Sequence, residues 1–123
     1  MTVLFDDDCG FCRWSVSRLA VWDRHRRLRF EPIRSEAGDA SLEGMDVAQR
    51  ARSWHVVTRR GLIASAGAAM PFLLRELPAG APLARLAETF PRSTDRAYQA
   101  IARRRDVLGR LLHVDACDAP TPR

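Results

Sequence analysis

The chain has 123 residues, enough for one domain of ordinary size with a single buried core. Hydrophobic residues make up 46% of it, which excludes an intrinsically disordered chain. The formal net charge is +5, and all 20 basic residues are arginine. Because the arginines are scattered and no aromatic residues are interleaved with them, we expect a solvated arginine-rich surface and no nucleic-acid partner.

The longest mostly apolar run covers residues 61–74, which is too short to span a bilayer and contains Pro71. The N-terminus lacks the basic segment and the apolar segment of a secretory signal. We therefore expect a cytoplasmic protein with no membrane partner. In that reducing compartment, a pair of closely spaced cysteines is more often catalytic or metal-binding than a structural disulfide.

Cys9 and Cys12 lie between two predicted elements, a buried strand over residues 1–5 and a helix from about Gly10 to Asp23. Residues three apart in the first turn of a helix lie on neighbouring faces, near the Cα separation of about 5.5 Å that a disulfide needs. The free N–H groups and the positive dipole end of the helix would stabilise a thiolate there. A CxxC beside a strand–helix unit is typical of a redox motif.

The helical spacing also distinguishes the two thiols. One face of the predicted helix carries Phe11, Cys12, Ser15, Val16, Leu19 and Trp22. Cys12 is therefore predicted to point inward, and Cys9 to lie at the exposed tip. This asymmetry favours Cys9 as the attacking thiol and Cys12 as the shielded resolving thiol. A metal half-site and an inert pair of cysteines are the alternatives.

A second strand is predicted over residues 28–33, where apolar and polar residues alternate and Pro32 fits the end. Since a helix connects it to the first strand, the two would lie parallel in a right-handed βαβ unit. Residues 35–51 are predicted to form a loop with short helical turns. One of these turns would cover residues 46–52, with Asp46 near its cap.

The middle of the chain has the pattern of a β-hairpin. Residues 53–58 are predicted to form a third strand, and residues 62–64 a short fourth strand that pairs with it. The turn between them covers residues 59–61, in which Gly61 is free to take a positive φ. The order β-α-β followed by β-β-α predicts a mixed sheet.

Three helices are predicted after the hairpin. The first covers residues 66–77, is capped by Ser65 and is mostly buried, and Pro71 marks a later start or a kink in it. The second carries Leu83, Leu86, Ala87 and Phe90 on one face and is stopped by Pro91. The third runs from Ser93, its predicted cap, to about Leu108, with Ala97, Ile101 and Leu108 inward and Arg103, Arg104 and Arg105 towards solvent.

The complete pattern predicts an α/β sandwich with a central mixed four-stranded sheet, flanking helices and a helical C-terminal extension, the outline of the thioredoxin-like fold. We assign residues 1–110 to this one domain and residues 111–123 to a tail. The tail contains two prolines and little that could be buried, so we expect it to be frayed.

Phe5-Asp6-Asp7-Asp8-Cys9-Gly10-Phe11-Cys12 resembles the opening signature of the DCC family of predicted thiol-disulfide oxidoreductases, (Y/F)-D-G-D-C-x-x-C. Weaker similarities to the family's second strand, middle and final helix lie at Leu28-Arg29-Phe30 with Pro32, at Gly61 with residues 65–77, and at residues 98–105. The resemblance covers about residues 2–110 and implies a thioredoxin-like fold and thiol–disulfide exchange. One position departs from the signature, because Asp7 stands where the family has glycine.

Asp6 and Asp8 are candidate site residues beside the two cysteines. A carboxylate near the resolving thiol could take its proton, whereas the alternative role is to complement the helix dipole and cap the loop. Negative charge beside Cys9 also disfavours its thiolate, which makes the dithiol a better reductant. We therefore hypothesise a reducing couple, an effect that Arg13 would oppose.

Two further features bear on the predicted chemistry. Thioredoxin-like enzymes usually hold a cis-proline before the third strand, and this chain has Arg52-Ser53-Trp54 there, so Ser53 or a neighbour would face the sulfurs. Trp54 would pack in the core or flank the dithiol. Cys117, four residues after His113, completes a possible zinc set with the CxxC, but the simpler interpretation is a stray thiol and no metal site.

The sequence thus predicts an enzyme without a bound cofactor, in which a redox-active Cys9–Cys12 disulfide exchanges with a protein or small-molecule disulfide or dithiol. Cys9, Cys12, Asp6 and Asp8 are the candidate catalytic residues. The alternative is a non-catalytic thioredoxin-like interaction module, whose CxxC is vestigial or binds a metal.

Overall fold

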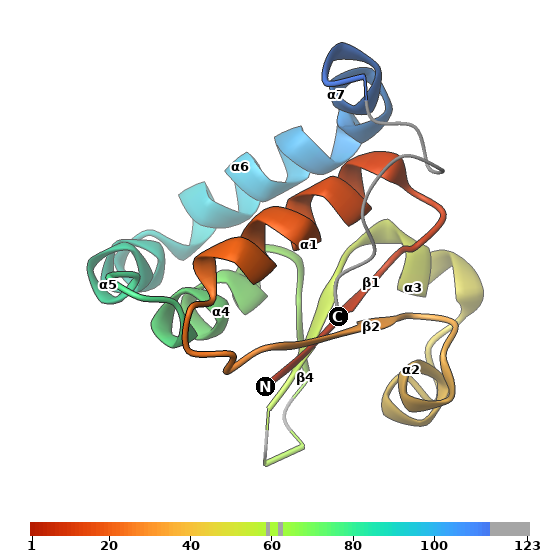
Figure 1. Ribbon diagram of the computed structural model, residues 1–123, viewed down its shortest axis with the longest axis horizontal. Helices are drawn as coiled ribbons and strands as arrows, with labels where there is room; N and C mark the ends of the chain where they lie inside the picture. Colours follow the sequence, from red (N-terminus) through yellow and green to blue (C-terminus); the bar gives the residue numbers. More distant parts are fainter. Residues whose placement is uncertain (59, 62, 114–123) are drawn as a thin grey trace.

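The structure is a computed structural model that describes residues 1–58, 60–61 and 63–113 (Figure 1). The elements in chain order are β1 (Thr2–Phe5), α1 (Gly10–Trp22), β2 (Arg29–Pro32), α2 (Glu36–Ser41), α3 (Val47–Arg52), β3 (His55–Val57), β4 (Ile63–Ser65), the 3-10 helix η1 (Ala66–Ala69), α4 (Met70–Glu76), α5 (Ala81–Thr89), α6 (Pro91–Arg103) and α7 (Arg105–Leu111).

The four strands form one mixed sheet in the order β2-β1-β3-β4. β1 pairs in parallel with β2, with Val3 opposite Phe30, and the connection between them is α1. β3 runs antiparallel to both β1 and β4, with Val56 opposite Val3 and Ala64. This arrangement confirms the predicted α/β class, in which a βαβ unit and a β-hairpin share one thioredoxin-like sheet.

The alternating side chains of β1 serve two separate cores, because successive residues of a strand point to opposite faces. Val3 and Phe5 pack in the larger core, which also contains Val16 of α1 and Leu73 of α4. Leu4 packs on the other face of the sheet with Ile33 and Leu42. β1 is therefore buried on both faces and holds the loop that follows it in a fixed place.

The two short helices in the polar middle of the chain, α2 and α3, are each capped by a side chain. Asp46 caps α3 through a hydrogen bond that its side chain accepts from the Gln49 N–H, and Gln49 returns a bond to the Asp46 N–H in a capping box. Ser35 caps α2 in the same way through the Gly38 N–H. Gly61 has the expected positive φ of +73°, whereas Arg59 and Leu62, included in the predicted turn and strand, lie outside the described residues.

Ser65 occupies the predicted N-cap position, at the start of η1, but its side chain does not cap the helix. Its hydroxyl makes no cap hydrogen bond and is instead 2.6 Å from Nδ1 of the buried His55 on the paired strand. The helix consequently begins as a 3-10 turn, and α4 starts at Met70 with Pro71 in its first turn, where a missing N–H costs nothing. The later start that Pro71 indicated is thus confirmed.

Of the face predicted for α5, only Ala87 is buried. Ala84 and Ala87 are the buried residues, while Leu83, Leu86 and Phe90 are about half exposed. α5 packs against α4. At the N-cap of α5, a Cβ on Gly80 would lie 1.9 Å from the Leu74 carbonyl oxygen, so only glycine fits at that position.

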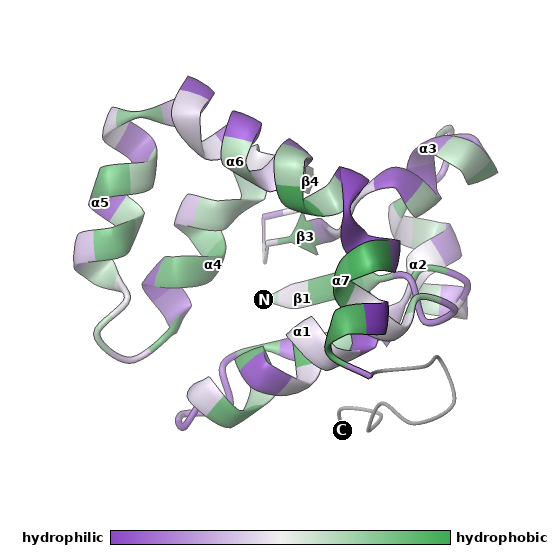
Figure 2. Cartoon of the chain, turned by 90° about the horizontal axis from the view of Figure 1, so that it is seen from above, coloured by the Kyte–Doolittle hydropathy of each residue, from purple (hydrophilic) through white to green (hydrophobic). Residues whose placement is uncertain are grey.

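The C-terminal helix differs from its prediction at both ends. It begins at Pro91 rather than at Ser93, since proline is well suited to the first position of a helix. It then breaks at Arg104, and α7 continues in a new direction (Figure 1). α6 mixes hydrophilic and hydrophobic residues along its length (Figure 2), so much of it remains open to solvent. The tail from residue 114 onward lies outside the described residues.

Candidate active site

Cys9 is the N-cap residue of α1. Its backbone is extended, and its Sγ accepts a hydrogen bond from the Cys12 N–H at 3.3 Å. A serine or aspartate normally makes this contact at the start of a helix. Here a sulfur replaces the oxygen, so one of the unpaired N–H groups of the first turn points at the thiol. Both Cys9 and Cys12 are free thiols in the structure.

The surroundings separate the acidities of the two thiols. The hydrogen bond from the Cys12 side chain, followed by that from the Cys12 N–H and by the charge of Arg105, lowers the pKa of Cys9 to about 7, although burial and Asp6 oppose it. The hydrogen bond to Cys9 and burial raise the pKa of Cys12 far above its usual range. Cys9 is therefore the thiol that ionises near neutral pH, as expected for an attacking thiol.

Arg105 is a site residue that the sequence interpretation placed in solvent. The break at Arg104 turns the first residue of α7 back towards the cysteines, and α7 packs against α1. Nη1 of Arg105 donates a hydrogen bond to the Ala51 carbonyl oxygen at 2.9 Å, across 54 residues of sequence. Its positive charge lowers the pKa values of Cys9 and Cys12. The prediction of a solvated Arg103-Arg104-Arg105 run is wrong at this one position.

The two candidate carboxylates lie in different surroundings. The side chain of Asp6 is only 12% exposed and lines the same pocket as Cys12. The side chain of Asp8 is 65% exposed and pairs with Arg34. Arg34 also approaches Asp6, at 3.9 Å. The structure therefore brings Asp6 to the thiols and directs Asp8 towards the surface.

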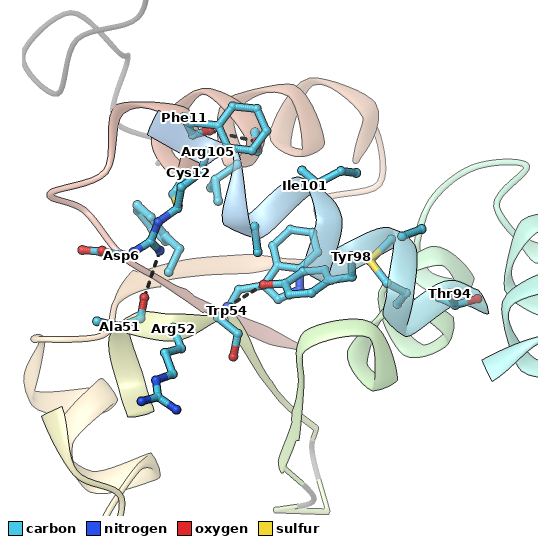
Figure 3. A pocket seen from close by; sticks show the side chains of 17 residues that line it. Asp6, Phe11, Cys12, Ala51, Arg52, Trp54, Thr94, Tyr98, Ile101 and Arg105 are labelled. Atoms are coloured by element: carbon cyan, nitrogen blue, oxygen red, sulfur yellow. Dashed lines mark hydrogen bonds between the residues drawn. The ribbon is translucent and has the colours of Figure 1, made fainter. Parts of the chain in front are cut away.

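A pocket of about 430 Å³ opens beside the dithiol (Figure 3). Its walls come from α1, α6, the first residue of α7 and the segment before β3. Cys12, Asp6 and Arg105 lie at one end, Thr94 lies at the other, and the rings of Trp54 and Tyr98 lie between (Figure 3). No pattern along the chain indicates this cavity, because its walls come from segments that are far apart in the sequence.

Trp54 and Tyr98 form a fixed aromatic pair in this pocket. Their ring centroids are 5.8 Å apart, and the Tyr98 hydroxyl accepts a hydrogen bond from the Trp54 N–H at 3.1 Å. Burial raises the pKa of Tyr98 to about 12. The segment that carries Trp54 is the place of the usual proline in thioredoxin-like enzymes, and the described residues contain no cis peptide bond. Ser53 and Trp54 both line the pocket.

Asp7, which departs from the family signature, does not have a positive φ. The backbone at this position therefore does not require glycine. One carboxylate oxygen of Asp7 is buried with no hydrogen-bond partner among the described residues. Within the same described ranges, no group of three His, Cys, Asp or Glu side chains could hold a metal ion. Cys117, which the possible zinc set required, lies outside them.

A mixed sheet in this order, with a CxxC at the N-terminus of its first helix, defines a thioredoxin-like protein with a candidate dithiol site. The chain matches the DCC1-like thiol-disulfide oxidoreductase family over residues 3–111, and it belongs to that family. This confirms the resemblance found in the opening motif. No curated protein sequence and no solved structure gives a significant match. Among the described residues, no helix is long and apolar enough to cross a membrane.

Proposed function

We propose that the chain is a thiol-disulfide oxidoreductase in which Cys9 attacks and Cys12 resolves. The observation that carries this proposal is the position of Cys9 at the N-cap of α1, with a pKa of about 7 beside a Cys12 thiol of much higher pKa. About half of Cys9 would then be thiolate at neutral pH. A dithiol with one ionised and one protonated member is ready to reduce a disulfide.

In the first step, the Cys9 thiolate attacks one sulfur of a substrate disulfide. A mixed disulfide forms between Cys9 and that half of the substrate, and the other half leaves as a thiolate. Cys12 then loses its proton and attacks Cys9 Sγ, which releases the second half as a thiolate and leaves a Cys9–Cys12 disulfide. Two electrons pass from the protein to the substrate.

Asp6 is the proposed acceptor for the Cys12 proton. Formation of the mixed disulfide removes the negative charge of Cys9, and the mostly buried Asp6 carboxylate lines the same pocket as Cys12. Because Asp8 points to Arg34 at the surface, we assign it no proton transfer.

We propose that the protein acts as a reductant in a reducing compartment such as the cytoplasm. Asp6 opposes the Cys9 thiolate, as expected, but the hydrogen bonds from Cys12 and the charge of Arg105 outweigh it and lower the pKa of Cys9. The proposed direction therefore rests on the compartment and not on a disfavoured thiolate.

Trapping the intermediate tests this order of events. Cys12→Ser protein treated with a model disulfide is expected to accumulate one mixed disulfide on Cys9, detected by mass spectrometry of the intact protein and its peptides. Cys9→Ser should form none at Cys12 on the same time scale, and Cys117→Ser should behave as the unmodified protein. Faster labelling of Cys12 than of Cys9 would reverse the assigned roles. Labelling of neither thiol would favour the non-catalytic interaction module.

A further inference from the structure

The pocket beside the dithiol carries a further inference, which deepens the proposed function and rests on it. We propose that the pocket binds a low-molecular-weight organic disulfide, one half of which has an aromatic or branched alkyl group next to a carboxylate. The apolar group would lie between α1 and α6, and the carboxylate at Arg105.

The size and chemistry of the pocket support a small organic ligand. Its volume of about 430 Å³ lies in the range of small-molecule sites, which are mostly apolar with a few placed polar groups. The apolar walls include Phe11, Met70 and Ile101, and the last of these is half exposed. The charged side chains of Asp6 and Arg105 lie at the Cys12 end (Figure 3).

The aromatic wall is already ordered before any ligand arrives. Trp54 is held by its backbone N–H, which donates to Tyr98, and by its indole Nε1, which donates to the Ala66 carbonyl at 3.4 Å. A preformed aromatic surface binds a flat or bulky apolar group without a further loss of side-chain entropy. Cys12 lines the same pocket and Cys9 does not. Because the Cys12 N–H donates to Cys9 Sγ at 3.3 Å, a disulfide held in the pocket would reach Cys9 past Cys12.

The backbone at the pocket argues against an extended peptide as the bound substrate. Peptides often bind by adding main-chain hydrogen bonds to an exposed backbone. Both main-chain polar groups of Trp54 already have hydrogen-bond partners. Its N–H donates to the Tyr98 hydroxyl, and its carbonyl oxygen accepts from the Ala66 N–H at 3.2 Å. A ligand at this position therefore binds through side-chain surfaces.

The charges at the sulfur end indicate a carboxylate on the ligand. Arg105 lies at this end of the pocket with the carboxylate of Asp6, whereas the side chain of Arg52, which also lines the pocket, points away from Cys12 (Figure 3). Arg105 makes a hydrogen bond through Nη1 to the Ala51 carbonyl, and it has no salt bridge to any carboxylate in the described part of the chain. Its remaining N–H groups can donate to an acidic group of the substrate, since a guanidinium has five donors.

A pocket-bound disulfide would react in the same two steps. The Cys9 thiolate forms a bond to the sulfur of the pocket-bound half while the substrate S–S bond breaks, and the unbound half leaves as a thiolate. Cys12 then attacks Cys9 Sγ, and the bound half leaves as the second thiolate. Only the Cys12 proton is released during the exchange, and it passes to Asp6, because Cys9 reacts as a thiolate and both halves of the substrate leave as thiolates.

A matched pair of substitutions on α6 tests the pocket. Ala97 is exposed and lines the pocket, whereas Ala100 is exposed on the same helix and does not. Ala97→Trp would fill the pocket, and Ala100→Trp would add the same side chain outside it. The probes are 5,5′-dithiobis(2-nitrobenzoate), which is aromatic and carries carboxylates, and bis(2-hydroxyethyl) disulfide, which is small and uncharged.

Single-turnover oxidation of the reduced protein is followed with both probes. Ala97→Trp is expected to slow the reaction with the aromatic probe by about tenfold, a change of about 1.4 kcal/mol, and that with the small probe by less than about twofold. Ala100→Trp should change neither rate by more than about twofold. Equal effects of Ala97→Trp on the two probes, or no effect on either, would overturn the proposed pocket.

A binding measurement separates this inference from the proposed function. The thioether 5-(methylthio)-2-nitrobenzoate cannot exchange, so its quenching of tryptophan fluorescence reports binding alone. Saturable quenching in the unmodified protein, lost in Ala97→Trp and kept in Ala100→Trp, is the expected result. If this pattern appears while the dithiol fails to react with disulfides, the proposed function fails and the pocket remains. If the dithiol reacts but no saturable binding is found, the pocket proposal is wrong.

Discussion

The guanidinium group of Arg105 donates a hydrogen bond to the backbone carbonyl of Ala51 at 2.9 Å, and this contact ties the start of α7 to the segment before β3. It holds a positive charge beside the two cysteines, which come from a third part of the chain. The two hydrogen bonds from Cys12 lower the pKa of Cys9, and the charge of Arg105 lowers it further by a smaller amount. The acidity of the attacking thiol therefore depends on a residue near the C-terminal end of the domain.

Replacement of Arg105 by methionine is expected to raise the pKa of Cys9, because the thiolate loses a nearby cation. At pH 6 the alkylation of Cys9 by iodoacetamide should slow by about threefold, since fewer molecules carry the thiolate. The measurement is the pH profile of Cys9 alkylation, resolved by peptide mass spectrometry.

Arg103→Met is the matched control for this experiment, since it removes the same charge from an exposed position two residues earlier. It should leave the Cys9 profile unchanged. An equal change in both variants would mean that net charge, rather than the position of Arg105, controls the thiol.

Asp6→Asn is expected to slow the second step of exchange, because the asparagine cannot accept the proton of Cys12. We expect the release of product from the Cys9 mixed disulfide to become at least about tenfold slower, whereas the first step should not slow. Quenched-flow sampling with mass spectrometry would measure the two steps separately.

Asp8→Asn serves as the control, because Asp8 is mostly exposed and paired with Arg34. It should leave the second step within about twofold of the unmodified protein. A slow second step in Asp8→Asn but not in Asp6→Asn would contradict the placement of the two carboxylates.

The structure also makes a spectroscopic prediction for Tyr98, the only tyrosine in the sequence. Burial raises its pKa to about 12 in the folded protein, against about 10 in an unfolded chain. The tyrosinate absorbance at about 295 nm should therefore appear about two pH units later in the folded protein than in guanidinium chloride. Because the unfolded chain loses this proton first, stability should fall as the pH rises above about 10. Coincident titrations would contradict the buried hydroxyl.

The buried His55 is expected to make the free energy of unfolding fall at acid pH. Its imidazole is 1% exposed and lies between the Ser65 hydroxyl and the Arg50 carbonyl oxygen, and burial lowers its pKa. As the pH falls, the imidazole binds a proton in the unfolded chain before it does so in the folded protein. The contribution of His55 to the free energy of unfolding is therefore complete above about pH 6.5 and is lost as the pH falls towards the lower pKa of the folded protein. Urea unfolding at pH 7.5 and 5.5 measures the change.

His55→Gln should remove this part of the pH dependence, although it lowers the stability at both pH values. His25→Gln is the control, because His25 is exposed, and it should keep the pH dependence of the unmodified protein. If both variants keep the full dependence, other groups cause it.

The sequence was sufficient for the parts of this protein that depend on local pattern. The strands, the parallel and antiparallel pairing, and the CxxC at a helix start could all be predicted, because each has a periodicity or spacing of its own. The cap at Asp46 followed from the preference for aspartate in that position.

The parts that were missed depend on contacts between distant segments. The inward position of Arg105 results from the helix break at Arg104 and from the packing of α7 on α1. α5 packs against α4 with Ala84 and Ala87 buried, whereas Leu83 and Leu86 of the predicted face stay exposed. The hydroxyl of Ser65 bonds to His55 across the hairpin rather than to its own helix. Pattern along the chain carries none of this information.

The most direct test of the account is the redox equilibrium of Cys9 and Cys12 in dithiothreitol and glutathione buffers, followed by acid quenching and thiol counting by mass spectrometry. We predict a single reversible two-electron transition between about −120 and −300 mV, towards the reducing end. It should be lost in Cys9→Ser and in Cys12→Ser and kept in Cys117→Ser. Thiols that stay reduced across the whole range, or a disulfide that forms only with Cys117, would contradict the assignment of the dithiol as the active site.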